Sequence, residues 1–98
     1  MKVLIAEDEL LAAERIQGLL KVCAPEAVVV EQVDSVEDTI TFFKSGNKID
    51  LLLLDIQLAD GKSFEIFDKI NVDVPVIFIT AFDQYAIQAF KFHSIDYL

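Results

Sequence analysis

The sequence predicts an α/β fold in which a doubly wound parallel sheet is covered by helices on both faces. The most apolar stretch, Leu51 to Leu54, ends in Asp55 and is far too short to cross a membrane. A strand that is apolar on both faces is typical of the middle of a parallel sheet. Strand and helix patterns alternate along all 98 residues, with connections long enough for right-handed crossovers. These observations favour one doubly wound domain.

The first strand is predicted over residues 2–6, directly before an acidic run over residues 7–9. A helix is predicted over about residues 9–23, with Pro25 as a stop just beyond it. Its apolar residues recur at helical spacing and form one stripe: Ala12, Ile16, Leu19, Leu20 and Cys23.

The second strand is predicted over residues 27–33, which are rich in valine. Ser35 is a good N-cap for a second helix that reaches about Lys44, and Gly46 ends it. The third strand is predicted over residues 49–55, the central apolar stretch described above.

The remaining elements follow the same alternation. A loop is predicted over residues 57–62, a helix over about 64–70, a strand over 75–79, a helix over about 84–92 and a fifth strand over 95–98. Turn, cap and apolar residues mark these bounds: Asp60, Gly61, Phe64, Phe67, Ile70, Pro75 and Asp83. No helix follows the fifth strand, so we expect one face of the sheet to be partly bare.

Composition fits one small domain over residues 1–98. The formal net charge of −9 argues against non-specific binding of nucleic acid by this segment. Cys23 is the only cysteine, so there is no disulfide framework, and we expect it to be a small buried residue in a reducing compartment. The sequence shows no signal peptide and no membrane-spanning run. We therefore expect a cytoplasmic domain that does not contact a membrane.

Polar side chains stand at the ends of three predicted strands. Glu7 and Asp8 follow the first strand, Asp55 ends the third, and Thr80 follows the fourth. Open α/β sheets bind ligands at the carboxyl ends of their strands. A strand order of 2-1-3-4-5 would make the first and third strands neighbours and would bring the three carboxylates together.

Such a cluster points to a divalent cation, because unpaired carboxylates repel one another. Oxygen ligands without cysteine or histidine favour Mg²⁺ over zinc. Magnesium sites usually combine one or two carboxylates with phosphate oxygens, which suits phosphoryl chemistry. Asp55 is the best candidate for a nucleophile that forms an acyl phosphate, although the residues alone also allow it to be only a metal ligand. Thr80 could donate a hydrogen bond to a phosphoryl oxygen.

At these residues the chain resembles the receiver domain of bacterial two-component response regulators. The resemblance rests on the acidic strand end at residues 3–9 (VLIAEDE), the stretch at 51–61 (LLLLDIQLADG) and the strand at 76–81 (VIFITA). Residues 82–86 (FDQYA) and 94–98 (SIDYL) are similar to the subgroup with a LytTR-type DNA-binding output domain, the LytR/AlgR type.

The resemblance implies a flavodoxin-like (CheY-like) five-stranded sheet of order 2-1-3-4-5. Asp55 would accept a phosphoryl group from a phosphohistidine on a sensor histidine kinase. Asp8 would bind Mg²⁺ directly, Glu7 directly or through water, and Gln57 through its backbone carbonyl. The domain would catalyse only its own phosphoryl transfer and dephosphorylation, so it would not be an enzyme acting on separate substrates.

The resemblance also implies a switch and an output. Thr80 would bond the phosphoryl group and move inward, and the rotamer of Tyr97 would follow it. This would change a dimerisation surface around the fourth helix and control transcription through an output domain that this chain lacks, its only route to DNA. The family's site lysine and last helix would follow Leu98, and this chain does not contain them. Without the lysine we expect weaker phosphorylation, and without the helix we expect a bare sheet face that drives self-association. Ala59 stands where many members have proline, a change expected to have only a minor effect on loop stiffness.

Three alternatives stay open. A haloacid-dehalogenase-type phosphatase also has an Asp nucleophile after an apolar strand, but it needs a second Asp where this chain has Gln57. A nucleotide- or flavin-binding module would need a Gly-rich loop after the first strand, where the acidic run would repel phosphate. A receiver fold used only as an interaction module would differ in showing no Mg²⁺-dependent labelling by acetyl phosphate.

Overall fold

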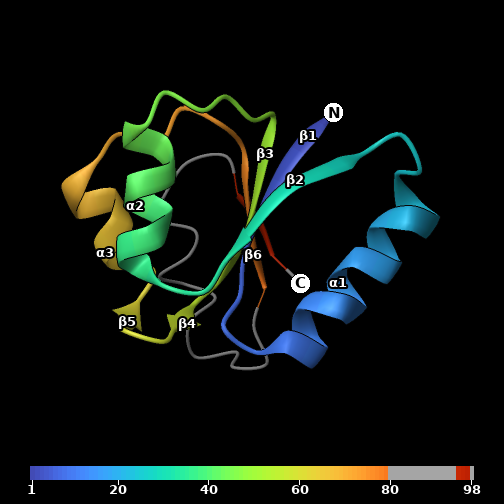
Figure 1. Ribbon diagram of the computed structural model, residues 1–98, viewed down its shortest axis with the longest axis horizontal. Helices are drawn as coiled ribbons and strands as arrows, with labels where there is room; N and C mark the ends of the chain where they lie inside the picture. The colour runs from blue at the N-terminus through green and yellow to red at the C-terminus, as the bar shows by residue number, and fades with distance from the viewer. Residues whose placement is uncertain (80–94, 98) are drawn as a thin grey trace.

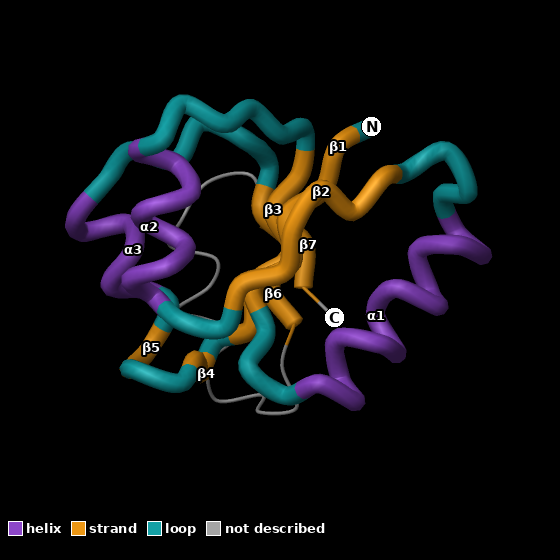
Figure 2. Tube along the Cα trace, in the orientation of Figure 1, coloured by secondary structure: helices purple, strands orange, loops and turns teal. Residues whose placement is uncertain are grey.

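The computed structural model describes residues 1–79 and 95–97, and the structural statements below refer to these residues. The elements follow one another as β1 (Lys2–Ala6), α1 (Leu10–Cys23), β2 (Val28–Val33), α2 (Val36–Lys44), β3 (Leu51–Asp55), β4 (Gln57–Leu58), β5 (Gly61–Lys62), α3 (Phe64–Lys69), β6 (Val76–Ile79) and β7 (Ile95–Tyr97). Five strands form a parallel sheet of order β2-β1-β3-β6-β7, and β4 pairs with β5 separately (Figures 1 and 2). Counted along the chain, the order of the main sheet is the expected 2-1-3-4-5.

The sheet is doubly wound, as the sequence predicts. Helix α1 lies on one face, and α2 and α3 lie together on the other (Figures 1 and 2). β3 is the middle strand, paired with β1 on one side and β6 on the other. The helix predicted over residues 84–92 lies outside the described residues. Among those described, no helix is long and apolar enough to cross a membrane.

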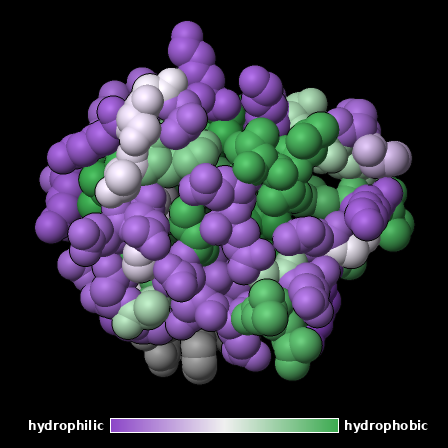
Figure 3. Space-filling model, viewed as in Figure 1, coloured by the Kyte–Doolittle hydropathy of each residue, from purple (hydrophilic) through white to green (hydrophobic). Residues whose placement is uncertain are grey.

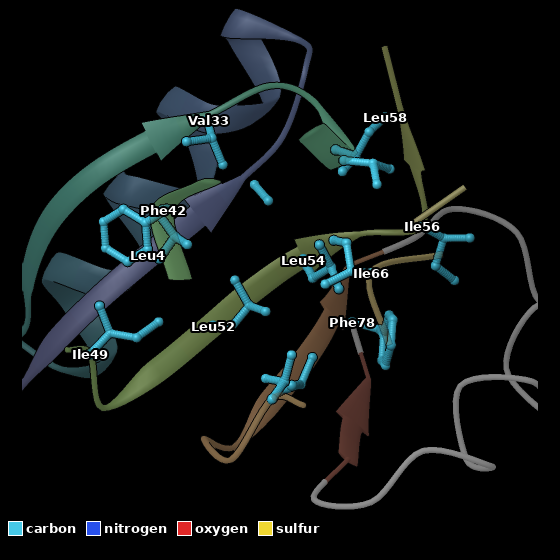
Figure 4. Packing of buried hydrophobic residues seen from close by; sticks show 14 residues of the cluster. Leu4, Val33, Phe42, Ile49, Leu52, Leu54, Ile56, Leu58, Ile66 and Phe78 are labelled. Carbon is cyan, nitrogen blue, oxygen red and sulfur yellow. The ribbon is translucent and has the colours of Figure 1, made fainter. Parts of the chain in front are cut away.

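The larger core lies between the sheet and the α2–α3 layer. Leu4, Leu52, Leu54 and Phe78 point into it from β1, β3 and β6, and each has no exposed surface (Figure 4). The alternate residues of the same strands, including Val3, Ile5 and Leu53, form a second cluster with Ile16 of α1. A strand that contributes leucines to both clusters must be apolar on both faces, which explains the run at residues 51–54.

Two predictions about local structure are wrong. Cys23 is exposed, and Leu19 is 54% exposed, so the predicted stripe of α1 is buried only around Ala13 and Ile16. The last turns of α1 border an apolar groove of about 350 Å³ instead of packing tightly on β3 and β6. Residues 57–62, expected as a loop, form the short antiparallel pair β4–β5.

Exposed apolar surface gathers on the α1 and β2 side of the described chain. Its large exposed side chains are Met1, Leu10, Leu11, Leu19, Val22, Val28 and Val30. In the space-filling view, hydrophobic surface forms a patch to the right of centre, whereas the side of α2 and α3 is mostly hydrophilic (Figure 3). The groove beneath α1 continues this apolar character, because Leu20, Leu51, Leu53 and Ile77 are among the residues that line it.

Candidate metal and phosphoacceptor site

The carboxyl ends of β1 and β3 bring three acids together. Glu7 and Asp8 follow β1 directly, and Asp55 is the last residue of β3. The two strands pair in parallel, with Ala6 beside Leu54, so their ends meet at one edge of the sheet. One carboxylate oxygen from each acid lies within 4.8 Å of the other two. The structure thus assembles the acidic cluster that the strand order predicts.

The three acids differ in their exposure to solvent. Glu7 is only 5% exposed, Asp55 is half-buried and Asp8 is exposed. Glu7 is fixed by its backbone, whose N–H donates to the Val33 carbonyl at 2.9 Å. Its carboxylate also accepts the N–H of Glu9 at 3.2 Å. A buried acid and an exposed acid therefore flank Asp55.

Burial shifts the protonation of the cluster. Burial, assisted by the hydrogen bond to Asp55, raises the pKa of Glu7 to about 8. Burial also raises the pKa of Asp55, while hydrogen bonds from Glu7 and from the Gln57 backbone N–H oppose the increase. Without a cation, the Glu7 carboxyl is therefore favoured in its protonated form at neutral pH, and its O–H donates a hydrogen bond to the Asp55 carboxylate.

The donor set fits a hard divalent cation. All three side chains offer carboxylate oxygens at mutual distances that one ion can span. A cation would supply the positive charge that the shared proton now supplies, and Glu7 could then ionise. Because the cluster holds oxygen donors only, Mg²⁺ fits better than zinc.

Gln57 lies in β4, two residues beyond Asp55, and its side chain is engaged within the hairpin. Its amide donates to the Leu58 carbonyl at 3.1 Å, and its side-chain oxygen accepts from Lys62 Nζ at 3.4 Å. These bonds leave the backbone carbonyl as the group through which Gln57 could contribute to a metal site.

Of the two predicted switch residues, the structure describes only the backbone of Tyr97. Thr80 lies outside the described residues. The backbone of Tyr97 belongs to β7 and pairs with Phe78 of β6, which places it in the sheet as expected, but its side chain lies outside the described part of the structure.

One interaction of the β4–β5 turn was not predicted from the sequence. Asp60 was expected only as part of a turn, whereas in the structure its carboxylate caps α2. The partners are 24 and 23 residues apart, so no local pattern could have shown the contact. An acidic residue in a turn close to a candidate site was the only available signal.

Comparison with known proteins agrees with this fold. The model of the response regulator receiver domain family matches residues 3–98. The sensory transduction protein LytT of Bacillus anthracis is 39% identical over 101 residues, covering 100% of this chain and 40% of that protein. The transcriptional regulatory protein BtsR of Escherichia coli K12 is 36% identical over 100 residues, covering 100% of this chain and 41% of that protein. The chain thus spans about two fifths of the length of these relatives.

Solved structures give the same result. The response regulatory domain of protein mrkE from Klebsiella pneumoniae superposes with a TM-score of 0.83 at 29% identity, covering 100% of this chain and 81% of that one. The response regulator PhyR from Brucella abortus gives a TM-score of 0.70 at 32% identity, covering 83% of this chain and 33% of that one. Together with the acidic cluster at the sheet edge, these matches show that the chain belongs to the response regulator receiver domain family, with LytT-type regulators among its relatives.

Proposed function

We propose that this domain is the phosphoacceptor of a two-component system and that Asp55 receives the phosphoryl group in a Mg²⁺-dependent reaction. The observation that carries the proposal is the convergence of Glu7, Asp8 and Asp55 within 4.8 Å at the carboxyl ends of β1 and β3. A half-buried carboxylate beside two further acids has the setting that a cation-assisted nucleophile needs.

In the proposed reaction, an oxygen of the ionised Asp55 carboxylate attacks the phosphorus of a phosphohistidine on a sensor kinase. The P–N bond breaks, the histidine nitrogen leaves with the electron pair, and Asp55 becomes an acyl phosphate. Glu7 and Asp8 would hold Mg²⁺, together with the Gln57 backbone carbonyl, and the ion would neutralise charge on the phosphoryl oxygens. Ionisation of Glu7 would release Asp55 from the shared proton and free its oxygen for attack.

The wider role follows from the relatives and belongs to the same proposal. Thr80 and Tyr97 would sense the phosphoryl group and change a dimerisation surface. A LytTR-type output domain elsewhere in the protein would then bind DNA, in the cytoplasm. The names of the relatives, a sensory transduction protein and a transcriptional regulatory protein, support this direction. The domain would catalyse only reactions of its own phosphoryl group.

Intact mass after incubation with acetyl phosphate tests the proposal. We expect one added phosphoryl group that requires Mg²⁺ and disappears in Asp55→Asn. Asp68→Asn, which removes an equal charge at an exposed position of α3, is the matched control and should label normally. Labelling that survives Asp55→Asn would contradict the assignment of Asp55. No labelling with or without Mg²⁺ would favour an interaction module.

A further inference from the structure

The turn between β4 and β5 is tied to the start of α2. Asp60 lies in this turn, and its carboxylate accepts the Val36 N–H at 2.6 Å and the Glu37 N–H at 3.1 Å. The next amide of the helix, that of Asp38, donates to Ser35 Oγ at 2.9 Å. The first amides of a helix have no partner within it. Two of these three are therefore satisfied by a side chain from another element.

A backbone hydrogen bond adds to the connection. The Ala59 N–H donates to the Asp34 carbonyl at 3.1 Å. Proline, common at this position in the family that the chain resembles, has no N–H to donate. The sequence predicts only a minor change in loop stiffness at Ala59, whereas the structure shows a specific bond between the hairpin and the segment that joins β2 to α2.

The same segment also holds the acidic loop. The carbonyl of Val33, at the end of β2, accepts the Glu7 N–H at 2.9 Å. Residues 33–37 therefore contact the loop that carries Glu7 and Asp8 as well as the hairpin that carries Gln57. This segment therefore bridges the two groups of candidate ligands.

The turn of the hairpin lies close to Gln57 along the chain. Gln57 pairs directly with Lys62, so the turn is only a few residues away. Gly61 has a φ of 150°, in the region that favours glycine. A Cβ at Gly61 would lie 2.5 Å from a carboxylate oxygen of Glu65, the second residue of α3.

We propose that Asp60 is a positioning residue for the cation site. By clamping the first turn of α2 to the β4–β5 hairpin, it fixes the Gln57 backbone carbonyl relative to Glu7 and Asp8, with Ala59 in support. The inference rests on the proposed function, which assigns the Gln57 carbonyl to the metal. Coupling between two sites is reciprocal, so Mg²⁺ bound at the acids should also slow amide exchange at the start of α2.

The test uses backbone NMR of the 98-residue chain and compares Asp60→Ala, Asp60→Asn and the charge control Asp68→Ala. Hydrogen exchange at the amides of Val36 and Glu37, measured without Mg²⁺, reports on the clamp alone. In Asp60→Ala this exchange should rise about fivefold, the size expected for loss of a helix cap. Titration with Mg²⁺ reports on the cation site.

Loss of an outer partner of a metal ligand weakens affinity by about tenfold, and we expect that loss of Mg²⁺ affinity in Asp60→Ala. Asp60→Asn keeps an acceptor oxygen and should recover part of both effects, whereas Asp68→Ala should show neither. Faster exchange with unchanged Mg²⁺ affinity in Asp60→Ala would overturn the positioning role and leave the proposed function intact. Absence of Mg²⁺ binding by the unmodified chain would overturn both proposals.

Discussion

At the scale of single residues, Glu7 has the strongly shifted pKa among the groups that the structure describes. Its side chain is almost fully buried beside two other acids, and burial is the main reason that its pKa rises to about 8. A carboxyl group that is neutral in the folded apo protein and charged in the presence of a cation links protonation to metal binding. This link leads to two predictions at residue scale.

Without Mg²⁺, stability should fall as pH rises. The folded pKa of Glu7, about 8, lies above its ordinary value of 4.5, so the folded state binds the proton more tightly than the unfolded state. The stabilisation is complete below the unfolded pKa and is lost as pH rises through the folded pKa. Urea denaturation between these values should show a declining free energy of unfolding, and Glu7→Gln should flatten the decline. Equal slopes for the two proteins would contradict the burial argument.

Asp8 and Glu9 provide a matched comparison, since they are adjacent, acidic and exposed, but only Asp8 belongs to the cluster. Asp8→Asn should weaken Mg²⁺ binding by at least about tenfold, because it removes a carboxylate ligand. Glu9→Gln should change it far less, through screened charge alone. Titration calorimetry measures the Mg²⁺ dissociation constants of the two variants and of the unmodified chain. Equal losses would mean that net charge, rather than ligand geometry, determines the affinity.

At the scale of elements, hydrophobic periodicity and caps predicted most of the fold. The expected strand over residues 2–6 and the cap at Ser35 are confirmed, and the third strand is two residues shorter than expected. These features are local, because each depends on neighbouring residues. The exposure of Cys23 was not predictable in this way, because it depends on how α1 packs on the sheet. The β4–β5 hairpin is local, but its two-residue strands are too short to show an alternating pattern.

The middle strand should dominate stability. Leu52 is fully buried in β3, and truncation to alanine should lower the free energy of unfolding by about 2–5 kcal/mol. Val28, at the start of the edge strand β2, is 58% exposed. Val28→Ala should therefore change the free energy of unfolding by about 0.5 kcal/mol or less. Urea denaturation of both variants makes the comparison. Similar losses at the two positions would contradict the assignment of β3 to the centre of the core.

At the scale of the whole molecule, the parallel topology converts distant acids into one cluster. Because polar side chains end the first and third strands, the sequence predicted this convergence together with the strand order. It could not predict the clamp by Asp60, since that contact depends on the relative position of a hairpin and a helix. The roles of Thr80 and Tyr97 stay predictions.

The exposed apolar surface of α1 and the groove between α1 and the sheet favour self-association of the chain. Leu19 borders the groove, Val22 is highly exposed on the same helix, and contiguous apolar surface favours association. We expect this 98-residue chain to self-associate at high micromolar concentration and expect Leu19→Gln combined with Val22→Gln to shift it toward the monomer. Light scattering measures the mass. A monomer at every concentration would contradict the expectation.

The central claim is that Asp55 is the phosphoacceptor of a Mg²⁺-dependent site, and chemical trapping tests it most directly. Borohydride reduces an aspartyl phosphate to homoserine, which peptide mass spectrometry locates in the sequence. After treatment with acetyl phosphate and Mg²⁺, we predict homoserine at position 55 and none when Mg²⁺ is removed by a chelator. Homoserine at another acid, or at position 55 without Mg²⁺, would contradict the claim.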